Sequence, residues 1–275
     1  VALSLYQVYG VPAAGREDEI AHMNAVKDRF VDYKIALDGL WVNGRNGVLL
    51  STAFELGTGS AATGGRAFAF PILTPAGSGG TVSVKSGGAS LTIEAAGKEP
   101  VTIPLGSLTY QSSNNYWVDQ TWTYQMGAVL LSQENRTTAR VGPSLSVYNT
   151  NGNATVSITP VNITGSASLA GSGPVRIETR LRDMGTYAGL TGEFTGVNIS
   201  IEAGDEGHAQ AWERAFREAV RRDALNSSWY EVGGASTTAY LYITGPYTDA
   251  TPDVGLSTIR ADYRVSITSA ASLIE

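Results

Sequence analysis

Cysteine is absent from this chain of 275 residues, which excludes a disulfide framework, a thiolate metal site and a cysteine nucleophile. Charged residues make up only 16% of the chain. The net charge is −6, and the only basic group is four arginines within residues 214–222, which argues against nucleic acid as a partner. Histidine occurs only twice, and no run reaches the roughly 18–20 apolar residues of a transmembrane helix.

Catalytic signatures are also missing. The chain has no nucleophile elbow, zinc-protease helix or EF-hand pattern, and the glycine-rich residues 59–66 lack the lysine of a phosphate-binding loop. A metal site at His22 and His208 would require two separate helices to meet, so we interpret both as surface or capping residues. Glu134 and Glu178 are candidates for the opposed pair of carboxylates in a glycosidase. The sequence gives no evidence that they lie at the separation such a pair requires. The sequence therefore predicts no enzyme, no metal and no cofactor.

An amphipathic helix is predicted near the start of the chain, over residues 17–40. Its apolar positions follow a 3-4-3-4-3 spacing, which places them on one helical face: Met23, Val26, Phe30, Tyr33, Leu37 and Leu40. The acidic residues 17–19 fall in the predicted first turn, where the helix dipole favours negative charge. We prefer this interpretation of the acidic run to a Ca²⁺ site.

A second helix is predicted over residues 206–225. Its apolar face contains Trp212, Ala215, Phe216, Ala219 and Val220. Asp205 and Glu206 at its start are interpreted in the same way as the first acidic run, as charges that the helix dipole stabilises rather than Ca²⁺ ligands.

Short strands account for most of the remaining sequence, in which 32 glycines accompany abundant serine and threonine. Strands are predicted at residues 48–56, 66–73, 81–85, 89–94, 100–110, 142–148, 155–159, 175–181, 196–201, 238–244 and 259–268. The Ser-Gly-Gly linkage at residues 86–88 is short enough for a hairpin. The predicted fold is mainly β, with an N-terminal stub and helix (together 1–44), the helix packed on antiparallel, sandwich-like sheets (45–275). A boundary near 110–145 would divide this body into two subdomains.

Aromatic side chains are concentrated in residues 110–133. Strand alternation would place Tyr116, Trp122 and Tyr124 on one face and Trp117 on the other. Such a ladder is an alternative ligand platform for carbohydrate, built from Tyr116, Trp117, Trp122 and Tyr124. We favour core packing by these rings, because large aromatic side chains contribute most to the burial of apolar surface.

Sequons for N-glycosylation occur five times, against roughly two expected by chance from this composition. All five lie beyond residue 130, and proline blocks none of them: Asn135, Asn153, Asn162, Asn198 and Asn226. Threonine-rich strands also produce such triplets by accident. As a group they favour a location outside the cell, with glycosylation of at least one site.

The sequence begins without methionine, in an apolar run that contains Val1, Leu3, Leu5 and Val8. We interpret this run as the end of a removed membrane-spanning or signal segment, with maturation of a secreted protein as the alternative. The native protein is then expected to be membrane-anchored through that missing segment. The isolated chain is expected to associate weakly or not at all.

Several segments resemble a family of uncharacterised archaeal type IV pilin-like surface proteins found in methanogens and halophiles. The similar segments are the helix with residues 21–24 and Phe30, the loop at 73–81, the aromatic segment at 116–133 and the strand at 142–145. The resemblance covers nearly the whole chain. It implies a membrane-anchored or pilus-associated β-rich ectodomain, and it brings no catalytic residues to this chain.

These observations predict a non-enzymatic structural or adhesive protein of the cell surface. Its partners would be copies of itself or other surface proteins, contacted through the N-terminal helix and exposed β-loops. The alternative is an extracellular module that binds or processes carbohydrate through the aromatic residues. The two differ in one observable: a carbohydrate site needs exposed rings along a concavity with convergent polar groups, whereas a structural domain buries the rings.

Overall fold

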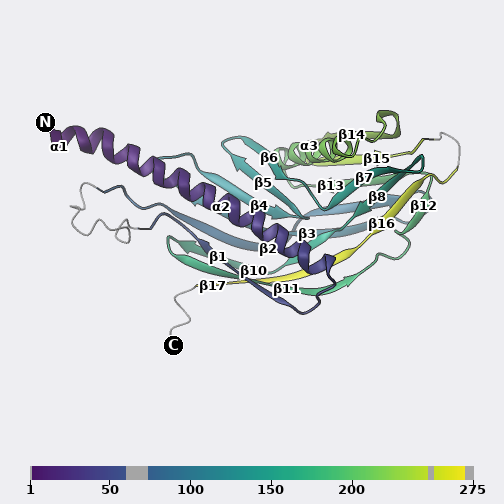
Figure 1. The fold of residues 1–275 in the computed structure, drawn as a ribbon, viewed down its shortest axis with the longest axis horizontal. Helices are drawn as coiled ribbons and strands as arrows, with labels where there is room; N and C mark the ends of the chain where they lie inside the picture. Colours follow the sequence, from purple (N-terminus) through teal and green to yellow (C-terminus); the bar gives the residue numbers. More distant parts are fainter. Residues whose placement is uncertain (1, 60–73, 247–250, 270–275) are drawn as a thin grey trace.

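The computed structural model describes residues 2–59, 74–246 and 251–269. Figure 1 shows an elongated molecule in which a long N-terminal helix runs along a body of curled β-sheets. The predicted fold class is confirmed: the protein is mainly β, its N-terminal helix packs on antiparallel sheets, and a second, shorter helix is present. The strand predicted at residues 66–73 lies outside the described residues.

The long helix starts earlier than the sequence predicts. α1 (Ala2–Leu5) and a π-helical turn, η1 (Tyr6–Gly10), lead directly into α2 (Val11–Val42). The apolar stripe from Met23 to Leu40 is buried as predicted, but it marks only the part of the helix that packs on the body. The prediction that residues 17–19 form the first turn is therefore wrong.

Within the described residues the strands form three sheets. The central sheet contains, in order of pairing, β14 (Tyr230–Ala235), β15 (Thr238–Ile243), β13 (Val197–Glu202), β2 (Gly79–Ala95), β3 (Val101–Ser113), β4 (Gln120–Gln125), β5 (Ala128–Gln133) and β6 (Arg136–Val141), and β10 (Ser166–Gly171) also pairs with β2. The first side sheet contains β1 (Leu49–Glu55), β11 (Pro174–Gly185), β17 (Arg260–Ser269) and β9 (Val161–Thr164). The second side sheet contains β12 (Gly192–Phe194), β16 (Val254–Thr258), β8 (Asn153–Ile158) and β7 (Leu145–Thr150). All pairings are antiparallel except β16–β8 and β17–β9.

The predicted hairpin at residues 86–88 is wrong, because β2 continues through them. Both flanking segments pair with the same partner strand: Lys85 lies opposite Ser107 and Ala89 lies opposite Leu105. The extra residues form a bulge in which Gly87 and Gly88 adopt φ of 73° and 105°. Glycine reaches these angles without the steric cost that a Cβ brings, so the two glycines kink one strand instead of ending it.

Two buried clusters lie on opposite faces of the central sheet. In β5, Ala128 and Leu130 belong to the cluster under α3 (Glu206–Arg222), whereas Val129 and Leu131 belong to the cluster under α2. Since successive residues of a strand point to opposite faces, this strand is covered on both sides. Residues 110–145, where the sequence suggests a boundary, thus contain a strand that both clusters share.

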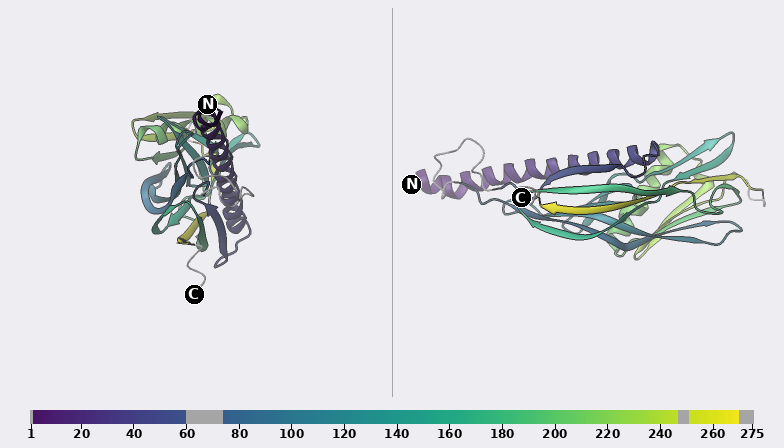
Figure 2. Two further views of the ribbon diagram at one scale, coloured as in Figure 1. Left: turned by 90° about the vertical axis from the view of Figure 1, so that its left-hand side faces the viewer. Right: turned by 90° about the horizontal axis from the view of Figure 1, so that it is seen from below.

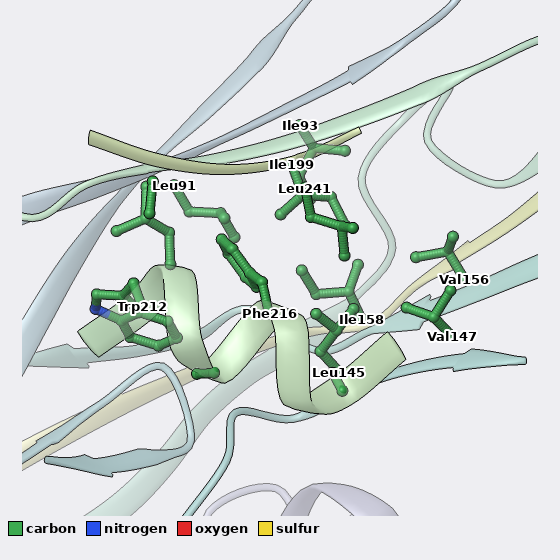
Figure 3. Close-up of a cluster of buried hydrophobic side chains, with 14 of the residues drawn as sticks. Leu91, Ile93, Leu145, Val147, Val156, Ile158, Ile199, Trp212, Phe216 and Leu241 are labelled. Atoms are coloured by element: carbon green, nitrogen blue, oxygen red, sulfur yellow. The ribbon is translucent and has the colours of Figure 1, made fainter. Parts of the chain in front are cut away.

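The α3 cluster joins the helix to the central and second side sheets. Figure 3 shows Trp212 and Phe216 directed from α3 toward the strands, near Leu91 and Leu241. The apolar face predicted for this helix is buried throughout. Asp205 caps its N-terminus by accepting a hydrogen bond of 2.9 Å from the backbone N–H of His208, which confirms the helix-start interpretation of Asp205. A single helical turn, η4 (Ser227–Trp229), follows.

The α2 cluster joins the long helix to the central and first side sheets. Phe30 is fully buried and packs edge-on against Phe54, with ring centroids 5.4 Å apart. Tyr33 packs edge-on against Tyr124 in the same way, at 5.3 Å, and its hydroxyl hydrogen-bonds Thr179 Oγ1 at 2.8 Å. The aromatic rings therefore fill the space between the helix and the sheets, and the Tyr33 hydroxyl keeps a partner whereas the buried Tyr124 hydroxyl has none among the described residues.

Candidate functional site

The loop between β3 and β4, residues 114–119, is fastened to α2 by one buried carboxylate. Glu19 is 1% exposed, and its two oxygens accept hydrogen bonds from the backbone N–H groups of Asn115 at 2.6 Å and Tyr116 at 2.8 Å. The charge of the carboxylate strengthens both hydrogen bonds. Glu19 belongs to the acidic run that the sequence assigned to the first helical turn, and its actual role is to hold this loop.

Two neighbouring helix residues complete the contact with the loop. Gly15 lies under the ring of Tyr116, where an added Cβ would come within 2.3 Å of the ring, so only glycine fits. Arg16 places its guanidinium 4.5 Å from the centre of the Trp117 ring, a cation–π contact. The loop is thereby positioned at the side of the helix, with Trp117 half-buried.

A groove of about 310 Å³ lies next to this loop, between α2 and strands β4–β6. Its described lining consists of Ile20, Met23, Asn24 and Lys27 from the helix, Trp117 from the loop, and Gln120, Trp122, Leu131, Gln133 and Arg140 from the strands. The indole N–H of Trp122 donates to Gln120 Oε1 at 3.0 Å, and Gln120 Nε2 donates to Gln133 Oε1 at 3.4 Å. The groove therefore combines two tryptophans, oriented amides and two cations.

The four aromatic residues of the predicted platform do not share one surface. Tyr124 is fully buried and Trp122 is 3% exposed, so their rings belong to the α2 cluster, in agreement with the favoured core interpretation. Tyr116 and Trp117 lie in the loop rather than in a strand, because β4 begins only at Gln120. Trp117 is the residue of the four that lines the groove while remaining partly open to solvent.

Sequence reasoning missed most of the groove. Lys27 and Arg140 are more than a hundred positions apart, and the chain has no local pattern that joins them. Gln120 and Gln133 stand in the aromatic segment, where their roles depend on the pairing of β4 with β5, which sets them directly opposite each other. A search for polar residues at paired strand positions would have found these two, but not the helix residues.

The histidines lie in different surroundings. His22 Nε2 is 3.1 Å from the hydroxyl of Tyr110, and burial lowers the pKa of His22 below its ordinary 6.5, against weaker raising effects of a Leu56 backbone hydrogen bond and the Glu19 charge. His208 pairs with Asp205 at 2.7 Å at the start of α3. Across residues 2–59, 74–246 and 251–269, no group of three or more metal-ligating side chains occurs.

The two carboxylates considered as a glycosidase pair lie on separate sheets. Glu134 is in the turn after β5 of the central sheet, with φ of 54°, whereas Glu178 is in β11 of the first side sheet. A second cleft, near the C-terminal ends of α2 and α3, is lined by paired charges: Lys34 with Asp38 at 2.6 Å, and Arg222 with Asp223 at 3.2 Å. Its ionic groups already neutralise one another.

The sequons differ in accessibility. Asn135 lies exposed in the turn between β5 and β6, and Asn226 lies exposed at the start of η4, where its Oδ1 accepts a hydrogen bond from Ser228. Asn153 is partly exposed at the start of β8. Asn198 donates its amide to Glu94 at 3.0 Å, and the amide of Asn162 donates to Asp262 at 3.2 Å. The amide nitrogens of Asn162 and Asn198 thus each already donate a hydrogen bond.

The N-terminal turns of the long helix extend past the ends of the described strands, as Figures 1 and 2 show. Residues 4–9 are all exposed, including Leu5 at 54%, Val8 at 62% and Tyr9 at 70%. The described helices include none that is long and apolar enough to cross a membrane. No described strand packs against this projecting segment, so its apolar side chains form an open helical surface.

Comparison with protein families gives one match: residues 78–249 match a family described as a family of unknown function (DUF7289). The match covers more than half of the chain and includes the loop at 114–119 and strands β4–β6. Comparisons with curated proteins and with solved structures give no match.

Proposed function

The chain belongs to this family of unknown function, and from its own residues we propose that it is a non-enzymatic structural or adhesive protein of the cell surface. The observation that carries the proposal is the projecting apolar segment, residues 4–9. Exposed apolar side chains gathered on one helix favour burial against another molecule or a lipid surface. The segment would anchor or assemble the protein, and the β-body would face the exterior.

Two further observations support a surface location. The five sequons include Asn135 and Asn226, which lie exposed in turns where an enzyme can reach them. The resemblance to archaeal pilin-like surface proteins has the same order of elements, a helix before a β-body. We expect glycopeptide mapping of the native protein to find sugar at Asn135 or Asn226 and none at Asn162, whose amide is engaged.

Fractionation of native cells tests the proposal. The protein should be recovered in the envelope or in sheared filaments, and Leu5→Glu with Val8→Glu should reduce that recovery, because charge on the projecting segment opposes its burial. Ile35→Glu with Val42→Glu is the matched control, since these residues are 63% and 64% exposed on the packed part of the same helix. Recovery only from the cytosol, with every sequon unmodified, would refute the surface proposal.

A second candidate function is carbohydrate binding, and the groove beside Trp117 favours it. A partly exposed ring next to oriented amides supplies both an apolar surface and hydrogen-bonding groups, which saccharide recognition requires. A binding screen of the purified chain against immobilised glycans tests this candidate. A carbohydrate site is one means of adhesion, so this candidate does not conflict with the first.

A further inference from the structure

The groove beside Trp117 continues along the open face of the central sheet. α2 covers β4, but β6 extends beyond the helix, as Figure 1 shows. A second depression of about 220 Å³ lies over β5 and β6 and shares Leu131, Gln133 and Arg140 with the first. The two depressions therefore form one elongated groove, whose long shape suits a chain of several units better than a single small molecule.

Positive charge is concentrated in this groove although the whole chain carries a net charge of −6. Lys27 and Arg140 line the first depression, and its described lining includes no carboxylate. Arg136 lines the second depression, where Glu134 is the acidic residue. Lys27 forms an exposed ion pair with Asp28 at 3.4 Å, whereas, in the part of the chain that the structure describes, neither Arg136 nor Arg140 forms an ion pair. Unpaired arginines are suited to carboxylate or sulfate groups, because the guanidinium donates to two oxygens at once.

The remaining lining is typical of a sugar site. The ring of Trp117 is fixed by Arg16 at 4.5 Å, and the amides of Gln120 and Gln133 are held by their contact with each other and with the Trp122 indole. Fixed amides offer both donors and acceptors to hydroxyl groups. Because little side-chain freedom is left to lose, a ligand would meet a prepared surface.

The strands of the floor argue against a peptide as the occupant. β4 pairs with β3 and β5, and β5 pairs with β4 and β6, so the backbone groups in the floor are already bonded. Strand addition is the usual source of affinity for an extended peptide, and a peptide that lies across β4 and β5 finds no free strand edge there. The outer edge of β6, the last strand of this sheet, has no partner strand among the described residues, so a peptide stays an outcome of the test below.

We propose that this elongated groove binds an acidic polysaccharide. One sugar ring packs against Trp117, hydroxyl groups contact the Gln120–Gln133 pair, and carboxylate or sulfate groups bind Lys27, Arg136 and Arg140. The proposal rests on the carbohydrate-binding candidate above and adds the charge class of the ligand and its site.

Calorimetric titration of the intact chain with sodium polygalacturonate tests the proposal. We expect binding that weakens as salt is added, and Lys27→Gln with Arg140→Gln should weaken it about tenfold, since two exposed charge contacts are lost. The control is Arg180→Gln with Arg264→Gln, which removes the same charge from two exposed, facing residues of β11 and β17 and should leave affinity unchanged. Circular dichroism and urea unfolding verify that both variants fold.

A neutral galactan and poly-glutamate separate the remaining outcomes. Equal affinity for the galactan would support carbohydrate binding but overturn the inference of an acidic ligand. Equal affinity for poly-glutamate would show a general polyanion site and overturn the saccharide part. Absence of binding to every glycan would overturn both the carbohydrate candidate and this inference, while the fractionation result on assembly would stand separately. Equal loss of affinity in the control variant would place the binding outside the groove.

Discussion

The two parts of the long N-terminal helix share one backbone and differ in their surroundings. From Gly15 onward the helix packs on the body, and Phe30, Tyr33 and Leu37 are fully buried. Residues 4–9 are comparably apolar and yet all exposed. The difference shows that apolar content does not decide burial in this molecule: a side chain is buried only where the loop at 114–119 and the strands reach the helix.

The charges along the helix follow the same division. The first fifteen residues carry no charged side chain, and from Arg16 onward every charged residue of the helix except the buried Glu19 occupies a position between the buried ones. A helix packed on one side and exposed on the other normally has this second pattern. The projecting part lacks a charged face for water, which is the reason that we propose a partner or a lipid surface for it.

The largest expected effect lies in the packed part. Phe30→Ala removes a fully buried ring from between Phe54 and Trp122, and we expect the free energy of unfolding to fall by about 3–5 kcal/mol. Urea denaturation followed by tryptophan fluorescence measures the change. Ile35→Ala is the control on the exposed side of the same helix, with an expected change below about 0.5 kcal/mol. A small effect of Phe30→Ala would mean that the helix is not packed as described.

A smaller effect is expected at the point where the two parts meet. Glu19→Ala leaves the partly buried N–H groups of Asn115 and Tyr116 without their charged acceptor, and we expect a loss of about 2–3 kcal/mol. Glu19→Gln keeps one acceptor oxygen and should lose less. Glu17→Ala removes an exposed carboxylate two residues away and should change stability by less than about 0.5 kcal/mol. Equal effects of Glu17→Ala and Glu19→Ala would contradict the anchoring role of Glu19.

Sequence patterns predicted the packed part of the helix better than its limits. The spacing from Met23 to Leu40 identified the buried face correctly because side chains that contact one surface must recur with the helical period. The start at Val11, preceded by η1, was missed because the projecting turns have no such period. The same reasoning succeeded for α3 and for most strands, where one face is buried.

The candidate groove was largely beyond prediction. Trp117 was identified from local composition, but its neighbours Lys27 and Arg140 come from elements that are distant in the chain and adjacent only after the central sheet is paired. The hairpin error at residues 86–88 has a related cause: two glycines allow either a turn or a bulge, and the pairing of both flanks with β3 decides between them. Long-range pairing was the missing information in both cases.

A pH-dependent effect smaller than that of Glu19→Ala is expected at His22, in the packed part. Because burial disfavours the charged imidazole, the pKa of His22 is lower in the folded protein than the 6.5 of the unfolded chain. As the pH falls below 6.5 the unfolded chain therefore binds the proton first, and the contribution of His22 to stability, present above pH 6.5, is progressively lost. Urea unfolding at pH 7.5 and pH 5.5 should show a smaller decrease for His22→Gln than for the parent chain. An identical decrease in both proteins would contradict this assignment.

The smallest expected effect on the free energy of unfolding lies in the projecting part, residues 4–9. It tests whether this part is free of contacts with the body. Leu5→Gln with Val8→Gln replaces side chains that are 54% and 62% exposed, and glutamine keeps a good helical preference. Because these residues bury little surface against the body, the free energy of unfolding should change by less than about 0.5 kcal/mol. The same substitutions should nevertheless reduce recovery of the protein in the envelope or filament fraction, since they lower the apolar surface available to a partner. A loss of more than about 1 kcal/mol in the isolated chain would mean that the segment packs on its own body, and the contrast between the two parts of the helix would then disappear.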